Sequence, residues 1–156
     1  MGYFMRYFIP QSAEQLSLST IGEALTAIDP RYTIQIDPTD TYFGDLYYDG
    51  RNLGEIEINH RDDEIFQEEI EDFLDLLRHS KDVQKEGVIH TLQATGQMVA
   101  ISAIWCDGDA DDADYVHDHI DPLWEWLDNQ YQGMLHADAD GFYHGDSLIL
   151  EMTTRI

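Results

Sequence analysis

The fold is decided by a stretch that begins Gln97-Met-Val-Ala-Ile-Ser-Ala-Ile-Trp-Cys106, continues as Asp107-Gly-Asp-Ala-Asp-Asp-Ala-Asp114, and then runs from Tyr115 to Tyr131. The first part is an apolar run of the length of a strand, which predicts a buried strand. The second part predicts an acidic loop. The third part has the apolar spacing of an amphipathic helix. The inward side chains of that helix are Val116, Ile120, Leu123, Trp124 and Leu127.

Upstream of this stretch, the sequence predicts a strand at residues 3–9 and then a helix. Ser12-Ala-Glu-Gln15 has the form of a capping box, in which two side chains satisfy free backbone groups at a helix start. Strands follow at residues 32–36, 42–48 and 51–59. Asp49-Gly50 predicts a type I′ hairpin because both residues tolerate a positive φ. Leu53-Gly54 then breaks the alternation of the last strand, as a bulge does.

A second helix is expected at residues 62–80, where apolar side chains recur at helical spacing. Residues 83–94 are ambiguous, because they can continue as helix over 83–92 or form a hairpin with the strand at 97–105. We favour strands from Gly87 onward. Two more strands, at 133–137 and 142–152, complete the expected chain. The stripe of the second helix consists of Phe66, Ile70, Phe73, Leu74 and Leu77.

These elements predict one α+β domain over residues 1–156, with a mostly antiparallel or mixed sheet of about six to eight strands covered by three helices. Residues 70–77 and 120–127 also align without gaps, and their apolar and acidic positions match except at Asp72 against Pro122. Residues 32–80 and 87–131 are therefore candidate pseudo-repeats of a degenerate ββα type.

The charge of the chain is far from balanced. The formal net charge is -24, and the residues between Glu86 and Thr154 include fourteen carboxylates and no Lys or Arg. Such a field repels nucleic acid, phosphate-bearing substrates and anionic membranes, and it attracts basic proteins and cations. We therefore expect a basic protein surface as the partner, with no direct binding to nucleic acid or membrane.

The leading hypothesis is a non-enzymatic acidic interaction module, which in its sharpest form is a nucleic-acid mimic that acts as an inhibitor or immunity-type protein. Like charges stacked along the second helix cost a few tenths of a kcal/mol per close pair, so their presence favours a role in binding. Trp126, which lies off the buried stripe, is the candidate aromatic anchor. The candidate carboxylates are Glu64, Glu68, Asp72 and Asp75 on the second helix and Asp109, Asp111, Asp112 and Asp114 in the loop.

A divalent-metal site, or a metal-dependent hydrolase built on one, is an alternative. Asp107, Asp109 and Asp111 alternate like the first ligands of a calcium loop. The sequence departs from that loop at its sixth and twelfth positions. His117 and His119 would share a face only on an extended segment, where they could bind zinc. No dedicated cofactor is expected beyond weak binding of Ca, Mg, Mn or Zn.

A third reading is that the acidity is environmental, as in salt-adapted organisms, since the chain has twenty-one Asp, eleven Glu and only two Lys. The sequence has no nucleophile elbow, phosphate-binding glycine loop or dinucleotide fingerprint, which favours a binding protein over an enzyme. One cysteine, Cys106, allows no internal disulfide, and we expect it to be buried as a small hydrophobe. Without a signal peptide or a long apolar run, the sequence predicts a cytoplasmic protein.

Overall fold

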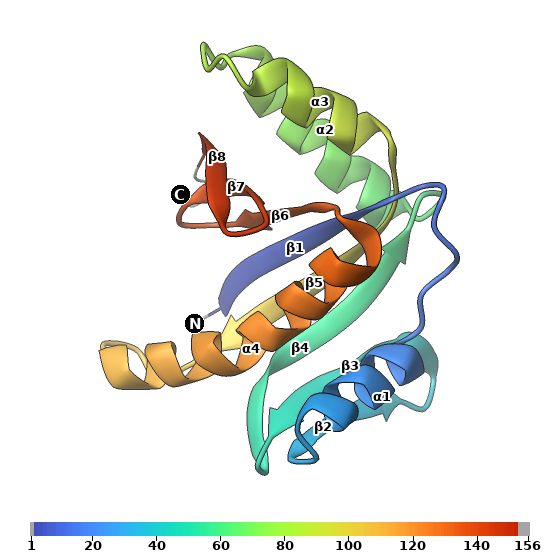
Figure 1. Cartoon of the computed structure of the whole chain (residues 1–156), viewed down its shortest axis with the longest axis vertical. Coiled ribbons are helices and arrows are strands. Elements are labelled where there is room, and N and C mark those ends of the chain that lie inside the picture. The colour runs from blue at the N-terminus through green and yellow to red at the C-terminus, as the bar shows by residue number, and fades with distance from the viewer. Residues whose placement is uncertain (1, 153–156) are drawn as a thin grey trace.

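The computed structural model describes residues 2–152 and shows an eight-stranded antiparallel sheet with four helices (Figure 1). The strand order is β2-β3-β4-β5-β1-β6-β7-β8. The α+β prediction and the antiparallel sheet are thereby confirmed. The strands are β1 (Gly2–Pro10), β2 (Tyr32–Asp37), β3 (Asp40–Tyr48), β4 (Arg51–His60), β5 (Thr95–Ile104), β6 (Met134–Ala137), β7 (Gly141–His144) and β8 (Ser147–Glu151). The helices are α1 (Leu18–Ile28), α2 (Glu64–Arg78), α3 (Lys85–Gln93) and α4 (Ala110–Tyr131).

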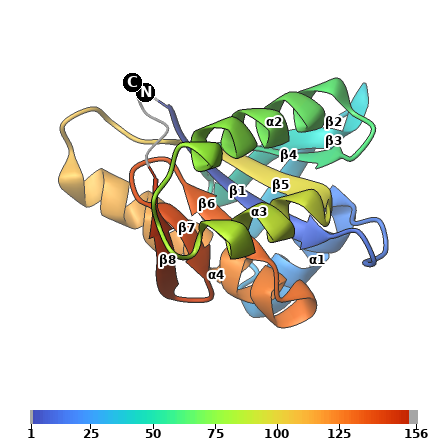
Figure 2. The same ribbon diagram turned by 90° about the horizontal axis from the view of Figure 1, so that it is seen from above.

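Helices cover both faces of the sheet, as Figure 2 shows from above. Successive residues of a strand point to opposite faces, so the central strand β1 contributes to two separate cores. Tyr7 and Ile9 pack in the larger core with α1 and α4, whereas Phe8 packs in the smaller core with α2 and α3. The helices α2 and α4 therefore lie on opposite sides of the sheet.

The predicted hairpin between β3 and β4 is confirmed. Asp49 and Gly50 have φ values of 51° and 80°, the left-handed conformations that a type I′ turn requires. The β3–β4 register shifts between Leu46 and Tyr47, opposite Gly54, which confirms the predicted bulge. Gly54 has φ 148°, and a Cβ atom there would lie 2.2 Å from the carbonyl oxygen of Ser102. Only glycine lets β4 approach β5 this closely.

The first helix begins later than predicted, because its cap is Ser17 and not Ser12. The Ser17 hydroxyl accepts a hydrogen bond from the backbone N–H of Thr20 at 3.2 Å. The preceding loop is held by the buried Gln97 of β5 instead of by a capping box. The Gln97 side chain accepts from the backbone N–H of Leu16 at 2.9 Å and donates to the carbonyl of Glu14 at 2.7 Å.

The prediction of a strand from Gly87 is wrong, because residues 85–93 form the helix α3. Val88 and Leu92, one helical turn apart, are both buried against α2, and the Thr91 hydroxyl donates to the carbonyl of Gly87 at 3.0 Å. Burial of one stripe against a neighbouring helix outweighs the local β propensity of this segment. The count of helices is thus four instead of three. The candidate repeat at 87–131 holds α3, β5 and α4, so it does not have the expected ββα order.

Replacement of Gly87 by Ala tests this helix directly. Gly87 is exposed, and a Cβ atom added there meets nothing within 4 Å. Gly87 is the third residue of α3, and alanine is more favourable than glycine in a helix by up to about 1 kcal/mol, so Gly87→Ala should raise the free energy of unfolding by about 0.5 kcal/mol. Urea denaturation measures the change. Gly50→Ala is the control, since the same substitution at φ 80° should destabilise the protein. A loss of stability in Gly87→Ala would contradict the helix.

The helix α4 begins earlier than the sequence predicts and takes in much of the expected acidic loop. Asp109 is its N-cap and accepts from the backbone N–H of Asp112 at 3.0 Å. Carboxylates at the positive end of a helix dipole are favourable, which explains why Asp111 and Asp112 join the first turn. The helix then continues through Pro122 as one element. No helix within residues 2–152 is both long enough and apolar enough to cross a membrane.

Candidate binding cavity

The candidate partner-binding carboxylates lie on two opposite faces of the molecule. The side chains of α2 named above, Glu64, Glu68, Asp72 and Asp75, are all exposed on the face that carries the smaller core. Asp109, Asp111 and Asp114 are exposed at the start of α4, on the face that carries the larger core. The sequence predicts one acidic surface, whereas in the structure these carboxylates form two separate surfaces.

At the start of α4, two of the candidate residues are occupied by contacts within the chain. Asp112 binds the guanidinium of Arg51 through both oxygens, at 2.7 and 3.0 Å, and accepts from the backbone N–H of Cys106 at 2.8 Å. That backbone hydrogen bond is the largest reason why the pKa of Asp112 lies below its usual value. Asp109 caps the helix. Cys106 itself is exposed, so the prediction of a buried cysteine is wrong.

The helix separates the two histidines of the candidate metal site. The Nδ1 of His119 donates to the carbonyl of Tyr115 at 2.7 Å, and its ring stacks on Tyr48 with centroids 4.1 Å apart. His117 packs instead against Tyr3 and Trp105. Asp107, Asp109 and Asp111 are exposed. Within the described part of the chain, no three His, Cys, Asp or Glu side chains come together in a group that could hold a metal ion.

Trp126 is half-buried and meets the ring of Tyr131 edge-on, with centroids 6.5 Å apart. Its neighbour Trp124 is 6% exposed, and its Nε1–H has no hydrogen-bond acceptor among residues 2–152. An unpaired buried donor is costly, on the order of 1–3 kcal/mol. Of the two tryptophans, Trp124 is therefore the one whose buried hydrogen-bonding group is left unsatisfied.

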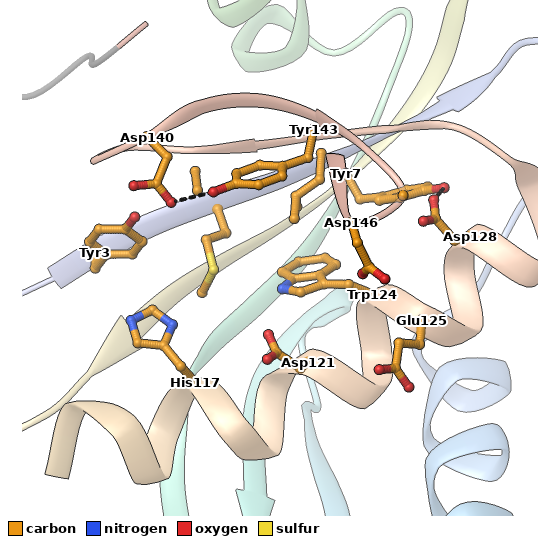
Figure 3. A pocket seen from close by; sticks show the side chains of 14 residues that line it. Tyr3, Tyr7, His117, Asp121, Trp124, Glu125, Asp128, Asp140, Tyr143 and Asp146 are labelled. Atoms are coloured by element: carbon orange, nitrogen blue, oxygen red, sulfur yellow. Dashed lines mark hydrogen bonds between the residues drawn. The ribbon is translucent and has the colours of Figure 1, made fainter. Parts of the chain in front are cut away.

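Trp124 forms part of the floor of a cavity of about 280 Å³ between α4 and the strands β1, β6 and β7 (Figure 3). Buried aromatic and apolar side chains form the bottom, and carboxylates stand around the opening. The cavity could not be predicted from the sequence, because it combines β1 at the start of the chain with α4, β6 and β7 near its end, and only the pairing of β1 with β6 brings them together. The lining residues that matter below are Tyr7, Trp124, Asp121, Glu125, Asp140 and Asp146.

Two of the cavity carboxylates are held by tyrosine hydroxyls. Tyr143 donates to Asp140 at 2.8 Å, and the buried hydroxyl of Tyr7 donates to Asp128. Burial, helped by the neighbouring Asp140, raises the pKa of Tyr143 to about 12. Burial is also the main cause of the raised pKa of Tyr7. Both tyrosines are therefore neutral hydrogen-bond donors at any physiological pH.

Three other carboxylates at the opening, those of Asp121, Glu125 and Asp146, make no hydrogen bond or ion pair with any residue that the structure describes. Partial desolvation raises the pKa of Asp121, His117 lowers it, and the carboxylates of Asp118, Glu125 and Asp146 raise it further. No Lys or Arg is among the lining residues. The cavity is thus an anionic site in which His117 is the one lining side chain that opposes the negative charge at Asp121.

Fold and site together define an antiparallel α+β protein with an anionic cavity floored by aromatic side chains. The chain matches no protein-family model, and no curated protein or solved structure matches it either.

Proposed function

We propose that the protein is a non-enzymatic module that binds a basic protein through the cavity face, defined here as Asp121, Glu125, Asp140 and Asp146 with the cavity between them. One observation carries this proposal: carboxylates from α4 and from the β6–β7 and β7–β8 turns surround one hollow whose lining contains no Lys or Arg. A partner that supplies positive charge would relieve their mutual repulsion. This relief contributes to the free energy of binding and not to that of folding.

The physics of such a surface favours rapid and salt-sensitive association. Clefts lined by charge of one sign focus the electrostatic field and raise the on-rate for a partner of opposite charge. Added salt screens that attraction, with a Debye length of about 8 Å at physiological ionic strength. The aromatic floor adds apolar area that salt does not screen, so part of the affinity should persist at high salt.

The α2 face supports a second candidate, nucleic-acid mimicry. Glu64 and Glu68 are one helical turn apart, and Glu68 and Asp72 are one further turn apart, which gives exposed charges spaced by about 6 Å along a rigid helix. A hollow between α2 and α3 lies on the same face, but its lining includes the cationic side chain of Arg61, unlike the lining of the cavity at α4. A mimic of this kind would compete with nucleic acid for its partner.

Two variants with equal loss of charge distinguish these functions. The first removes three carboxylates from the cavity face (Asp121→Asn, Glu125→Gln and Asp146→Asn). The second removes three from α2 (Glu64→Gln, Glu68→Gln and Asp72→Asn). All six residues are exposed, so both variants should fold. The immobilised protein is used to capture basic proteins, and Kd is then measured by calorimetry with one purified partner, in low and in high salt.

We expect the cavity-face variant to weaken binding by about tenfold or more, which corresponds to about 1.4 kcal/mol, and the α2 variant to change it little. A loss of affinity in the α2 variant alone, together with competition by duplex DNA, would contradict binding through the cavity face and support nucleic-acid mimicry by α2. Equal small losses of affinity in both variants would contradict the proposal and indicate non-specific attraction by a uniformly acidic surface.

A further inference from the structure

The cavity has the layout of a site for a flat cation. Its floor includes the rings of Tyr7 and Trp124, which are nearly parallel, with an angle of 14° and centroids 6.3 Å apart. In Figure 3, the carboxylates of Asp121 and Glu125 lie on the α4 side of the indole, and Asp140 with Tyr143 lies on the opposite side. A cation over the ring would have anionic oxygens on both sides.

This layout distinguishes among the cations that could bind. A divalent metal needs six or more oxygens at about 2.3–2.6 Å if it is calcium, whereas the cavity carboxylates do not converge in a metal-holding group within the described residues. An ammonium group is a compact point charge. A guanidinium group is planar, stacks on aromatic rings and projects five donors in its own plane. Of these three cations, only the guanidinium can stack on an aromatic floor and at the same time donate hydrogen bonds to carboxylates on both sides.

The size of the cavity agrees with one side chain. A volume of about 280 Å³ lies just below the range of roughly 300–1,000 Å³ that is usual for small-molecule pockets. An arginine side chain of seven heavy atoms beyond Cα fits within such a volume, while a nucleotide needs more room and brings charge of the wrong sign.

Trp124 supplies an independent sign that the site is incomplete. Its Nε1–H is buried without an acceptor in residues 2–152, and Figure 3 shows this edge of the indole turned toward His117 and Asp121. Asp121 has no hydrogen-bond partner there either. A cation over the indole would draw the Asp121 carboxylate inward, and this movement brings an acceptor toward the unpaired N–H.

We propose that the cavity binds the guanidinium of an arginine side chain presented by the basic partner, stacked on Trp124 between the carboxylates of α4 and those of the β6–β7 and β7–β8 turns. This inference rests on the proposed function for the source of the arginine but not for the chemistry of the site. A free guanidinium compound shares that chemistry, so the experiment separates the two sources.

The test follows the indole N–H resonances of the full chain by two-dimensional ¹⁵N NMR during titration with Nα-acetyl-argininamide. The protein has three tryptophans, and Trp124→Phe assigns the signal of Trp124. The matched ligand is Nα-acetyl-citrullinamide, which has the same shape without the charge. Nα-acetyl-lysinamide tests the preference for guanidinium over ammonium, and agmatine tests a free guanidinium compound.

We expect the arginine derivative to shift the Trp124 resonance in a saturable way, with Trp105 and Trp126 nearly unchanged. The citrulline derivative should bind about tenfold more weakly or not at all, and Asp121→Asn with Asp146→Asn should weaken arginine binding about tenfold, whereas Asp72→Asn on α2 should not. An equal response to citrulline, or no shift of Trp124, would overturn the inference.

The remaining outcomes separate this inference from the proposed function. If agmatine bound more tightly than the arginine derivative, the claim that the guanidinium comes from a protein partner would be wrong. Arginine binding in the cavity without any basic protein partner would overturn the proposed function and support the site. Tight binding of a basic protein that Asp121→Asn with Asp146→Asn leaves unchanged would overturn the inference alone.

Discussion

Acidification from about pH 7.5 to about pH 5 is expected to lower the free energy of unfolding by about 2 kcal/mol through a single residue, His136. The His136 ring is fully buried between Phe73 and Phe142, with ring centroids 4.6 and 4.7 Å away. Its Nε2 lies 3.1 Å from the carbonyl oxygen of Met152. A carbonyl only accepts, so Nε2 carries the proton of the neutral ring.

The other nitrogen explains the sign of the effect. Nδ1 of His136 is buried and has no partner within residues 2–152, so a proton there would add an unsatisfied donor and a buried charge. Burial lowers the pKa of His136 to about 4, and the nearby Arg6 lowers it as well, against the Met152 carbonyl, Asp138 and Asp140, which raise it. In the unfolded chain its pKa is about 6.5. Below about pH 6.5 only the unfolded state takes up this proton, so stability is lost as the pH falls from 6.5 toward 4.

Urea denaturation at several pH values measures this contribution, because urea leaves the ionic strength unchanged. The exposed His144 provides the matched control. His136→Gln should lose about 2 kcal/mol less than the wild type between about pH 7.5 and about pH 5, whereas His144→Gln should follow the wild type. The six other histidines and the carboxylates are common to the wild type and His136→Gln and cancel in the comparison. Parallel pH curves for His136→Gln and the wild type would show that His136 is not the titrating group.

Sequence patterns correctly predicted the elements whose conformation depends on residues close to one another in the chain. The stripe of α2 is buried as expected, because five apolar residues at helical spacing leave one way to remove them from water. Asp49-Gly50 specifies its hairpin through backbone conformation alone. By contrast, the segment at Val88 is compatible with helix and strand, and its state is set by contact with α2. The start of α1 depends likewise on Gln97, which is distant in the chain.

The cavity could not be predicted for a related reason. Its carboxylates are visible in the sequence as charges, but which of them acquire partners is decided by tertiary contacts. Asp112 forms an ion pair with Arg51 of the β3–β4 hairpin, and Asp128 accepts a hydrogen bond from Tyr7 of β1. Asp121 and Asp146, which are 25 positions apart, are left without partners beside one hollow. The total charge therefore predicts a cationic ligand from the sequence alone, whereas the place where we propose that it binds depends on the fold.

Tyr7→Phe is expected to destabilise the protein by about 3 kcal/mol, which is a decrease in Tm of about 6–12 °C for a chain of this size. The Tyr7 side chain is 1% exposed, and its hydroxyl joins three elements. It donates to Asp128 of α4 and accepts from the backbone N–H of Gly133 at 2.7 Å, just before β6. Phenylalanine would leave that N–H buried without a partner and would remove a hydrogen bond to a charged group.

Asp128→Asn is the informative comparison, because the asparagine side chain still offers an oxygen to the Tyr7 hydroxyl and the Gly133 contact stays. It should cost only about 1 kcal/mol, since a neutral acceptor replaces a charged one and one negative charge leaves a crowded region. Thermal unfolding and urea denaturation of both variants measure the difference. If Asp128→Asn cost as much as Tyr7→Phe, the stability would lie in the charge of Asp128 and not in the hydroxyl that joins β1, α4 and β6. Tyr7 is also part of the cavity floor, so the hydroxyl that links β1 to α4 and to the start of β6 lies beside the proposed binding site.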